Sequence, residues 1–168
     1  MLSDRELVSR AAEEDEDAFR ELYDRFANRV FRYAFTLLRN EHLSEEVTQE
    51  TMIAVWKGAM RFQGRSKVST WIFGIARNKS FDLMRREKRG DRVPERPLIS
   101  PDPAPALLKA EAVSGAMQEL PESQREVVFL TFFEGLSYGE ISKLLEIPEG
   151  TVKSRMFHAK RKLAEVLA

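Results

Sequence analysis

The 168-residue sequence contains no cysteine and only two histidines, His42 and His158. Without thiols the chain cannot form a disulfide bond, a thiolate metal site or a cysteine nucleophile. It also lacks a Walker-type glycine-rich phosphate loop and a His-Glu-x-x-His zinc motif. We therefore expect a protein that is not an enzyme and that needs no cofactor and no metal.

Long apolar runs are missing as well. No stretch of about 18 apolar residues could span a bilayer, and the N-terminal residues Met1 to Glu6 lack the apolar core of a signal peptide. Hydrophobic residues nevertheless make up 43% of the chain, which is enough for a folded core. These features predict a folded cytoplasmic protein of one domain or two small ones.

The chain also has no net charge, but its charges are unevenly distributed. Residues 61–100 hold 11 Lys+Arg against 4 Asp+Glu, and residues 151–168 hold 5 against 1. The remaining blocks, 1–60 and 101–150, are acidic. Two basic blocks indicate two places where a polyanion is bound, although a chance drift of charge is the alternative.

Proline is concentrated in one segment. Five of the seven prolines lie between Pro94 and Pro105, where apolar periodicity is weak, as in an extended spacer. We predict an all-α protein with two small helical domains, residues 1–90 and 109–168, joined by a Pro-rich linker at 91–108.

The first block predicts three helices before residue 61. Ser3 with Glu6 forms a capping box for a short helix, and Ser44 is expected to cap a helix that runs to about Met60. Between them, a core-facing stripe repeats every three or four residues at Phe19, Leu22, Tyr23, Phe26, Val30, Ala34 and Leu37.

The helix from Ser44 to Met60 carries a second stripe that combines polar with large apolar residues. Its members are Glu46, Gln49, Glu50, Ile53 and Trp56. Such a mixture resembles a protein interface, but Ile53 and Trp56 could equally pack on a neighbouring helix.

A basic loop follows from Phe62 to Ser69, and Ser69 or Thr70 is expected to cap a helix that runs from Trp71 to about Lys88. Aromatic residues here alternate with basic ones: Phe62, Trp71, Phe73 and Phe81 with Arg65, Lys67, Arg77, Lys79, Arg85 and Arg86. Basic charge follows a nucleic-acid backbone and aromatic faces stack on unpaired bases, so the region fits single-stranded nucleic acid. An amphipathic helix with its aromatics in the core is the alternative.

The C-terminal block predicts a helix-turn-helix. Pro121 opens a helix, a second capping box at Ser137 and Glu140 opens the next, and Ile147-Pro148 ends it. A last helix begins near Glu149 or Gly150, anchored by apolar residues at Val152, Met156 and Leu163. Its exposed side would read a DNA groove through Lys153, Ser154, Arg155, Phe157 and His158, with phosphate contacts from Lys160, Arg161 and Lys162.

Several motifs together resemble one family over nearly the whole chain. They include Phe19-Arg20-Glu21-Leu22-Tyr23, Glu46-Val47-Thr48-Gln49-Glu50, Phe62-Gln63-Gly64, the run from Ser69 to Asn78, Gly135 to Ile141, and Pro148 to Arg155. In this order and spacing they are similar to the bacterial extracytoplasmic-function (ECF, group 4) sigma factors of RNA polymerase. The resemblance implies a sigma region 2 in the first domain and a sigma region 4 in the second.

The resemblance also implies partners. The factor would bind core RNA polymerase at the beta-prime clamp helices and the beta flap, direct it to promoter DNA, and be held inactive by an anti-sigma factor. Docking on the clamp helices would use the stripe of Glu46, Gln49, Glu50, Ile53 and Trp56. The minus-35 duplex would be read by Thr151, Lys153, Ser154, Arg155, Phe157, His158, Lys160 and Arg161.

The melted non-template strand of the minus-10 element would be bound by the basic loop and the next helix. The implied residues are Phe62, Gln63, Gly64, Arg65, Lys67, Ser69, Thr70, Trp71, Arg77 and Asn78. Within this set, Asn78 would read a base edge and Phe62 would form the wall of a base pocket.

Two positions depart from the family pattern. Gly74 and His158 stand where many relatives carry a basic residue, which affects the promoter consensus expected for this chain. A self-sufficient helix-turn-helix regulator that binds duplex operators as a dimer is the competing interpretation. The basic and aromatic block from Phe62 to Arg89 argues against it, since such a regulator needs no site for unpaired bases.

Overall fold

The structure is a computed structural model and describes residues 1–90 and 115–168. The predicted linker, residues 91–108, lies outside these ranges. Every regular element in the described residues is helical, which confirms the all-α prediction. The chain divides into two compact units, and each is described by itself.

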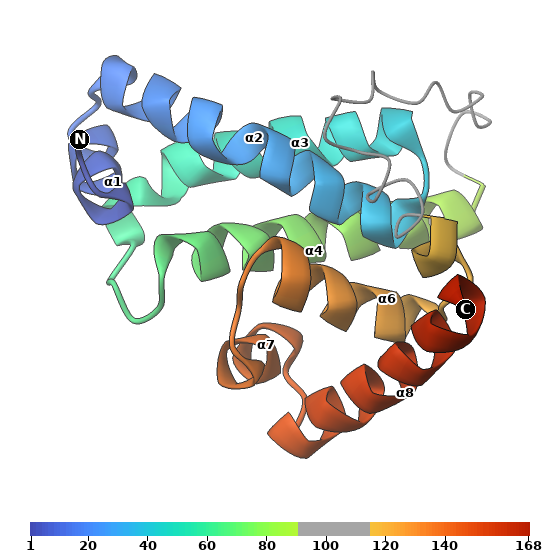
Figure 1. Ribbon diagram of the computed structural model, residues 1–168. Coiled ribbons are helices and arrows are strands. Elements are labelled where there is room, and N and C mark those ends of the chain that lie inside the picture. The colour runs from blue at the N-terminus through green and yellow to red at the C-terminus, as the bar shows by residue number, and fades with distance from the viewer. Residues whose placement is uncertain (91–114) are drawn as a thin grey trace. The chain divides into compact units, whose positions relative to one another are not determined.

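The first unit is built around its longest helix (Figure 1). It comprises α1 (Asp4–Ala12), α2 (Glu16–Leu38), α3 (Glu41–Gly58), the 3-10 turn η1 (Ala59–Arg61) and α4 (Val68–Lys88). Helix α2 packs against α1, α3 and α4. It begins after Asp15, whose carboxylate accepts from the backbone N–H of Asp17 and Ala18, and ends at Arg39 in the left-handed region (φ 55°).

Two helices begin earlier than the sequence predicts. Helix α3 is capped by Asn40, whose side-chain oxygen accepts from the N–H of Leu43 at 2.9 Å, so the prediction of Ser44 as the cap is wrong. Helix α4 begins at Val68, directly after Lys67, rather than after Ser69 or Thr70. A serine or threonine hydroxyl can cap a helix or bond inside one, and its position in sequence does not distinguish the two roles.

Four buried hydroxyls donate to a carbonyl of their own helix, whereas the buried Thr51 hydroxyl on α3 has no hydrogen-bond partner in the described residues. Ser44 Oγ donates to the carbonyl of Asn40 at 2.6 Å and Thr48 Oγ1 to that of Ser44 at 2.7 Å. On α2 and α4, Thr36 and Ser80 make the same bond with the carbonyl four residues earlier, at 2.8 Å each. Each of these bonds gives a buried hydroxyl a hydrogen-bond acceptor on its own helix.

Aromatic side chains form the centre of this core. Phe26, Tyr33 and Phe73 are fully buried, and the rings of Tyr33 on α2 and Phe73 on α4 meet edge to face at 5.5 Å. Phe73 is therefore a core residue, so for this aromatic the alternative of packing in the core applies. Tyr23 departs in the opposite direction: it is 42% exposed, although its spacing put it in the core stripe.

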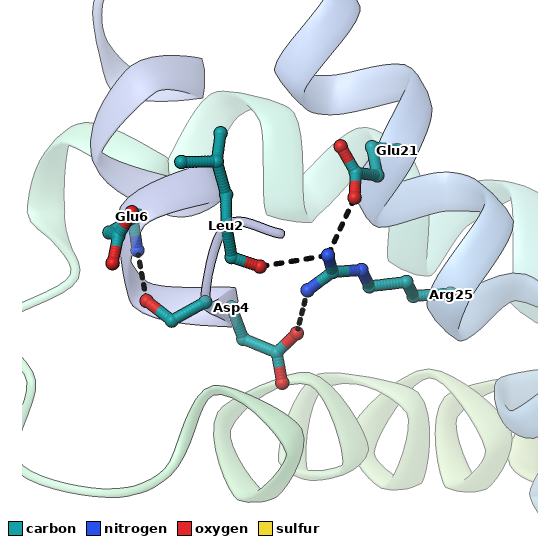
Figure 2. Close-up of polar contacts among 6 residues, drawn as sticks. Leu2, Asp4, Glu6, Glu21 and Arg25 are labelled. Atoms are coloured by element: carbon teal, nitrogen blue, oxygen red, sulfur yellow. Dashed lines mark hydrogen bonds and ion pairs between the residues drawn. The ribbon is translucent and has the colours of Figure 1, made fainter.

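Helix α1 is fixed to α2 by the Arg25 guanidinium, which reaches three groups (Figure 2). It donates to Asp4 at 2.9 Å, to the carbonyl of Leu2 at 2.8 Å and to Glu21 at 2.5 Å. The hydrogen bond with Asp4 is the largest of the effects that raise the pKa of Arg25. Ser3 caps α1, with its hydroxyl accepting from the N–H of Glu6 at 3.1 Å.

The second unit contains α6 (Glu122–Val128), the π-helical segment η2 (Phe129–Phe133), α7 (Tyr138–Leu145) and α8 (Glu149–Leu167). Arg125 donates to the carbonyls of Met117 and Leu120 and so ties the segment before α6 to that helix. The predicted capping box of Ser137 and Glu140 is confirmed, with both reciprocal bonds present. Phe132, an apolar residue of η2, is 62% exposed.

We predict that Phe73→Ala destabilises the protein by about 3 to 5 kcal/mol, because it leaves a cavity among fully buried rings. Urea denaturation followed by circular dichroism measures this loss. Tyr23→Ala removes an exposed aromatic from the same unit and should change the free energy of unfolding by less than about 1 kcal/mol. Equal losses for the two variants would contradict this description of the core.

Candidate nucleic-acid interface

The mixed stripe on α3 lies on the outer surface of the first unit, and its two large apolar members differ. Ile53 is 53% exposed, whereas Trp56 is half-buried with its ring edge-on to Phe19 of α2 at 5.0 Å. Trp56 therefore packs on a neighbouring helix, one of the two interpretations left open by the sequence. Ile53 instead lies on the open surface, as the interface interpretation requires. Gln49 is exposed, and Glu46 and Glu50 are half-buried beside it.

Two aromatic rings close the start of the loop between η1 and α4. Phe62 and Trp71 lie with their ring centroids 4.8 Å apart and their planes tilted by 35°. Both are half-buried, so each ring keeps a part open to solvent. The indole of Trp71 also lies against Gly58, where an added Cβ would come within 3.3 Å of it.

The basic loop has alternating exposure. Gln63, Arg65 and Lys67 are exposed, whereas Gly64 and Ser66 between them are half-buried. Gly64 has φ +70°, a conformation that favours glycine. The loop thus presents its longer polar and basic side chains outward from a backbone turned toward the protein.

The backbone of this loop is bonded to Arg5, a residue that the sequence analysis missed. The Arg5 guanidinium donates to the carbonyl of Gly64 at 2.8 Å and to that of Ser66 at 3.5 Å. The bonds join residues 59 and 61 positions apart, and no local pattern in the sequence indicates contacts at that separation.

Helix α4 continues the surface away from the loop. Asn78 is exposed two helical turns after Trp71, on the same face of the helix. Arg77 is half-buried and lies over the ring of Phe81, 4.5 Å from its centroid. Ser69 and Thr70 are half-buried in the first turn, and within the described residues the buried Thr70 hydroxyl oxygen has no hydrogen-bond partner.

In the second unit, α7 and α8 form the helix-turn-helix that the sequence predicts. Between them Glu146 takes the left-handed conformation (φ 57°), and Pro148 precedes the first turn of α8. The turn is closed by two bonds between Ser142 and Ile147: the N–H of Ile147 donates to the Ser142 carbonyl at 3.1 Å, and the Ser142 hydroxyl donates to the Ile147 carbonyl at 2.5 Å.

Helix α8 buries one row and exposes the other. Val152, Met156 and Ala159 are buried, as predicted for the first two, while Leu163 is half-buried. Among the predicted groove-reading residues, Thr151 and Arg155 are half-buried. The others are exposed: Lys153, Ser154, Phe157, His158, Lys160 and Arg161.

Phe157 is the most prominent apolar side chain on the open side of α8, with 57% of its surface exposed. The His158 ring lies edge-on at 5.5 Å, and the Arg161 guanidinium lies 5.9 Å from the ring centroid. Aromatic and basic groups thus lie together on the surface of this helix, as needed for contact with base edges and phosphates.

Other kinds of site find less support in the described part of the chain. There, no group of three or more His, Asp or Glu side chains could hold a metal ion, and no helix is long and apolar enough to cross a membrane. A shallow depression of about 340 Å³ in the second unit mixes both signs of charge, its lining being Glu119, Pro121, Gln124, His158, Arg161, Lys162 and Glu165.

Comparison with known proteins identifies the family. The family model for Sigma-70 region 2 matches residues 22–90, and that for Sigma-70, region 4 matches residues 110–163. The ECF RNA polymerase sigma factor SigK of Mycobacterium tuberculosis (strain H37Rv) is 32% identical over 171 residues, covering 96% of this chain and 91% of that protein. The chain belongs to the ECF sigma factors. SigM of Bacillus subtilis, another ECF sigma factor, is 30% identical over 85% of this chain and 91% of its own length.

Solved structures agree with this assignment. CnrH, in complex with the cytosolic domain of CnrY, has a TM-score of 0.72 at 27% identity and covers 98% of this chain and 96% of its own. The sigma factor RpoE of Bartonella quintana, in complex with the anti-sigma factor NepR, has a TM-score of 0.75 at 25% identity and covers 89% and 96%.

The protein is thus an alternative sigma factor, a transcription initiation factor that binds core RNA polymerase and directs it to promoters. This ECF sigma factor contains both sigma regions that its sequence implied, region 2 and region 4. The matches extend over both units, which decides against the alternative of a self-sufficient operator-binding regulator.

On α8, substituting two neighbouring residues should have very different effects on stability. Met156→Ala should cost about 2 to 5 kcal/mol of stability, because its side chain is buried and its sulfur accepts from the Thr131 hydroxyl. Phe157→Ala should leave stability within about 0.5 kcal/mol. Thermal or urea unfolding of both variants checks the orientation of α8, and a reversed order of the two losses would contradict it.

Proposed function

We propose that three exposed surfaces of this ECF sigma factor divide promoter recognition between them. The outer face of α3 binds core polymerase, the loop 62–67 with α4 holds the melted minus-10 strand, and α8 reads the minus-35 duplex. The observation that carries this proposal is the exposure of Ile53 among polar residues, on a helix whose other side is fully used by the core. The factor acts in the cytoplasm through binding alone and catalyses no reaction itself.

On α3, the polymerase-binding residues are Glu46, Gln49, Glu50, Ile53 and Trp56. Ile53 supplies an apolar contact, while Trp56 is held in place by Phe19 and offers its remaining open surface. The carboxylates and the amide around them give polar contacts at the rim, as in other protein interfaces. The partner surface is that of the beta-prime clamp helices.

The minus-10 element is captured as a single strand. Exposed basic side chains of the loop, Arg65 and Lys67, meet the phosphates, and the half-open rings of Phe62 and Trp71 form the wall against which an extruded base rests. Extrusion costs a few kcal/mol, which stacking and polar contacts offset. Asn78, exposed on the same face of α4 as Trp71, reads a base edge.

The full minus-10 set is unchanged from the sequence prediction. It comprises Phe62, Gln63, Gly64, Arg65, Lys67, Ser69, Thr70, Trp71, Arg77 and Asn78. Gly64, Ser69 and Thr70 contribute through the backbone and the shape of the loop, since their side chains are small and partly covered.

The minus-35 element is read by α8 in the major groove. Lys153, Ser154 and Phe157 face outward on the first three turns, where a recognition helix contacts base edges. Lys160 and Arg161 follow on the next turn and bind phosphates. Thr151, Arg155 and His158 flank this row, and the beta flap is a second partner of the same unit, for which exposed Phe132 and Phe133 provide apolar surface.

An anti-sigma factor is the expected regulator. The structurally similar CnrH and RpoE were solved with the cytosolic domain of CnrY and with the anti-sigma factor NepR, respectively. We propose that a protein of this kind covers the exposed surfaces of the present chain and keeps it from polymerase.

Ile53→Glu should weaken binding to core polymerase by roughly 30-fold or more, because it places an unpaired charge in an apolar contact. Titration of labelled sigma factor with core polymerase from the source organism measures the dissociation constant. Run-off transcription measures the corresponding loss of promoter-dependent transcript. Met60→Glu introduces the same charge at another exposed apolar residue outside the stripe and serves as the control. Unchanged affinity for Ile53→Glu would refute the docking face.

Substituting two lysines of α8 should affect promoter binding in different ways. Lys153→Ala should change which promoters of a library are used in run-off transcription, because a base contact discriminates by about 1 to 3 kcal/mol. Lys160→Ala should weaken all promoters alike and lower the slope of log K against log salt by about 0.9. A uniform loss for Lys153→Ala would assign it to phosphate instead.

A further inference from the structure

The basic loop 62–67 has a feature that the proposed minus-10 function does not use. Between its exposed side chains, the backbone carbonyls of Gly64 and Ser66 both accept from one guanidinium, that of Arg5 on α1. A loop without regular secondary structure loses conformational entropy when it is ordered on a ligand. A bond that orders it beforehand reduces this loss and so strengthens binding.

Arg5 can perform this task because its own helix is fixed. Helix α1 buries Leu7 and Val8 and packs on α2 and η1. Its first turn is held through Asp4 and the carbonyl of Leu2 by Arg25 of α2 (Figure 2). The loop is thus connected to α2 in two steps: Arg5 joins it to α1, and Arg25 joins α1 to α2.

Gly64 fits this arrangement closely. An added Cβ would lie 3.0 Å from the Arg5 guanidinium, and the residue has a φ of +70° that side chains rarely adopt. A glycine at this position therefore allows both the turn and the close approach of the guanidinium to the backbone.

We propose that Arg5 is a positioning residue for promoter melting: it holds the backbone of loop 62–67 in the conformation that receives the minus-10 strand, without touching DNA. The inference rests on the proposed role of this loop. Arg5 acts on the loop through carbonyl groups, so its contribution differs from that of Arg65 and Lys67, which meet phosphates directly.

The test uses holoenzyme reconstituted from core polymerase and the full chain. The probe is a fluorescein-labelled non-template minus-10 strand of a promoter that the wild-type factor uses in run-off transcription. Arg5→Gln should weaken binding of this strand by about tenfold or more, the factor expected for the loss of one hydrogen bond with a charged donor. Arg5→Lys should restore part of the affinity, because one ammonium can reach a single carbonyl.

Two controls separate positioning from other roles. Arg10→Gln removes a charge from the same helix at an exposed residue and should bind the strand as the wild type does. Salt dependence gives the second: Arg5→Gln should leave the slope of log K against log salt unchanged, whereas Arg65→Gln should reduce it by about 0.7, the value for a lost phosphate contact with a single strand.

A coupling measurement completes the test. Gly64→Ala disturbs the same contact, so its effect and that of Arg5→Gln should be less than additive in the double variant. Unchanged strand binding by Arg5→Gln, a reduced salt slope, or an equal loss of core-polymerase affinity would each overturn the inference. If wild-type holoenzyme itself fails to hold the strand, the proposed function of the loop fails instead.

Discussion

The burial of helix α2 against its neighbours determines the rest of the first unit. Phe26 and Tyr33 place α2 at the centre, and Tyr33 meets Phe73 of α4 edge to face. Once these rings are buried, each helix packed around them has only one side left for solvent. The outward positions of Ile53 on α3 and Asn78 on α4 follow from this packing, since the residues on the opposite sides fill the core.

In the second unit, too, packing of the core decides which side of each helix faces solvent. Val152, Met156 and Ala159 anchor α8, and the capping box at Ser137 fixes the start of α7 before the turn. An antiparallel bundle in one unit and a helix-turn-helix in the other give each a surface determined by its own packing. Two separate DNA elements can then be bound by units that each keep their shape.

Local signals in the sequence predicted most of these elements. The stripe on α2, the capping box at Ser137 and the break at Pro148 depend on residues a few positions apart, and all three are found in the structure. The same spacing rule failed for Tyr23, because periodicity gives a direction on the helix but not how far the neighbouring helices extend over it.

Longer-range features could not be predicted in this way. Whether Phe73 stacks on a base or on Tyr33 depends on the approach of two helices, and both outcomes share one local sequence. The contact of Arg5 with Gly64 depends on the path of the whole first unit. The start of α3 was misplaced because Asn40 and Ser44 are both good caps, and only the burial of Ser44 decides between them.

The hydroxyls buried in the first unit have a mechanical consequence. Ser44, Thr48 and Ser80 each donate to a carbonyl of their own helix, so these groups place no directional bond across a helix-helix boundary. Where such groups line a boundary, apolar contact holds the helices together, and this attraction tolerates small sliding displacements. The helices can therefore shift slightly along α3 and α4 without breaking these three hydrogen bonds, whereas the end where Arg25 and Arg5 bridge different elements stays rigid.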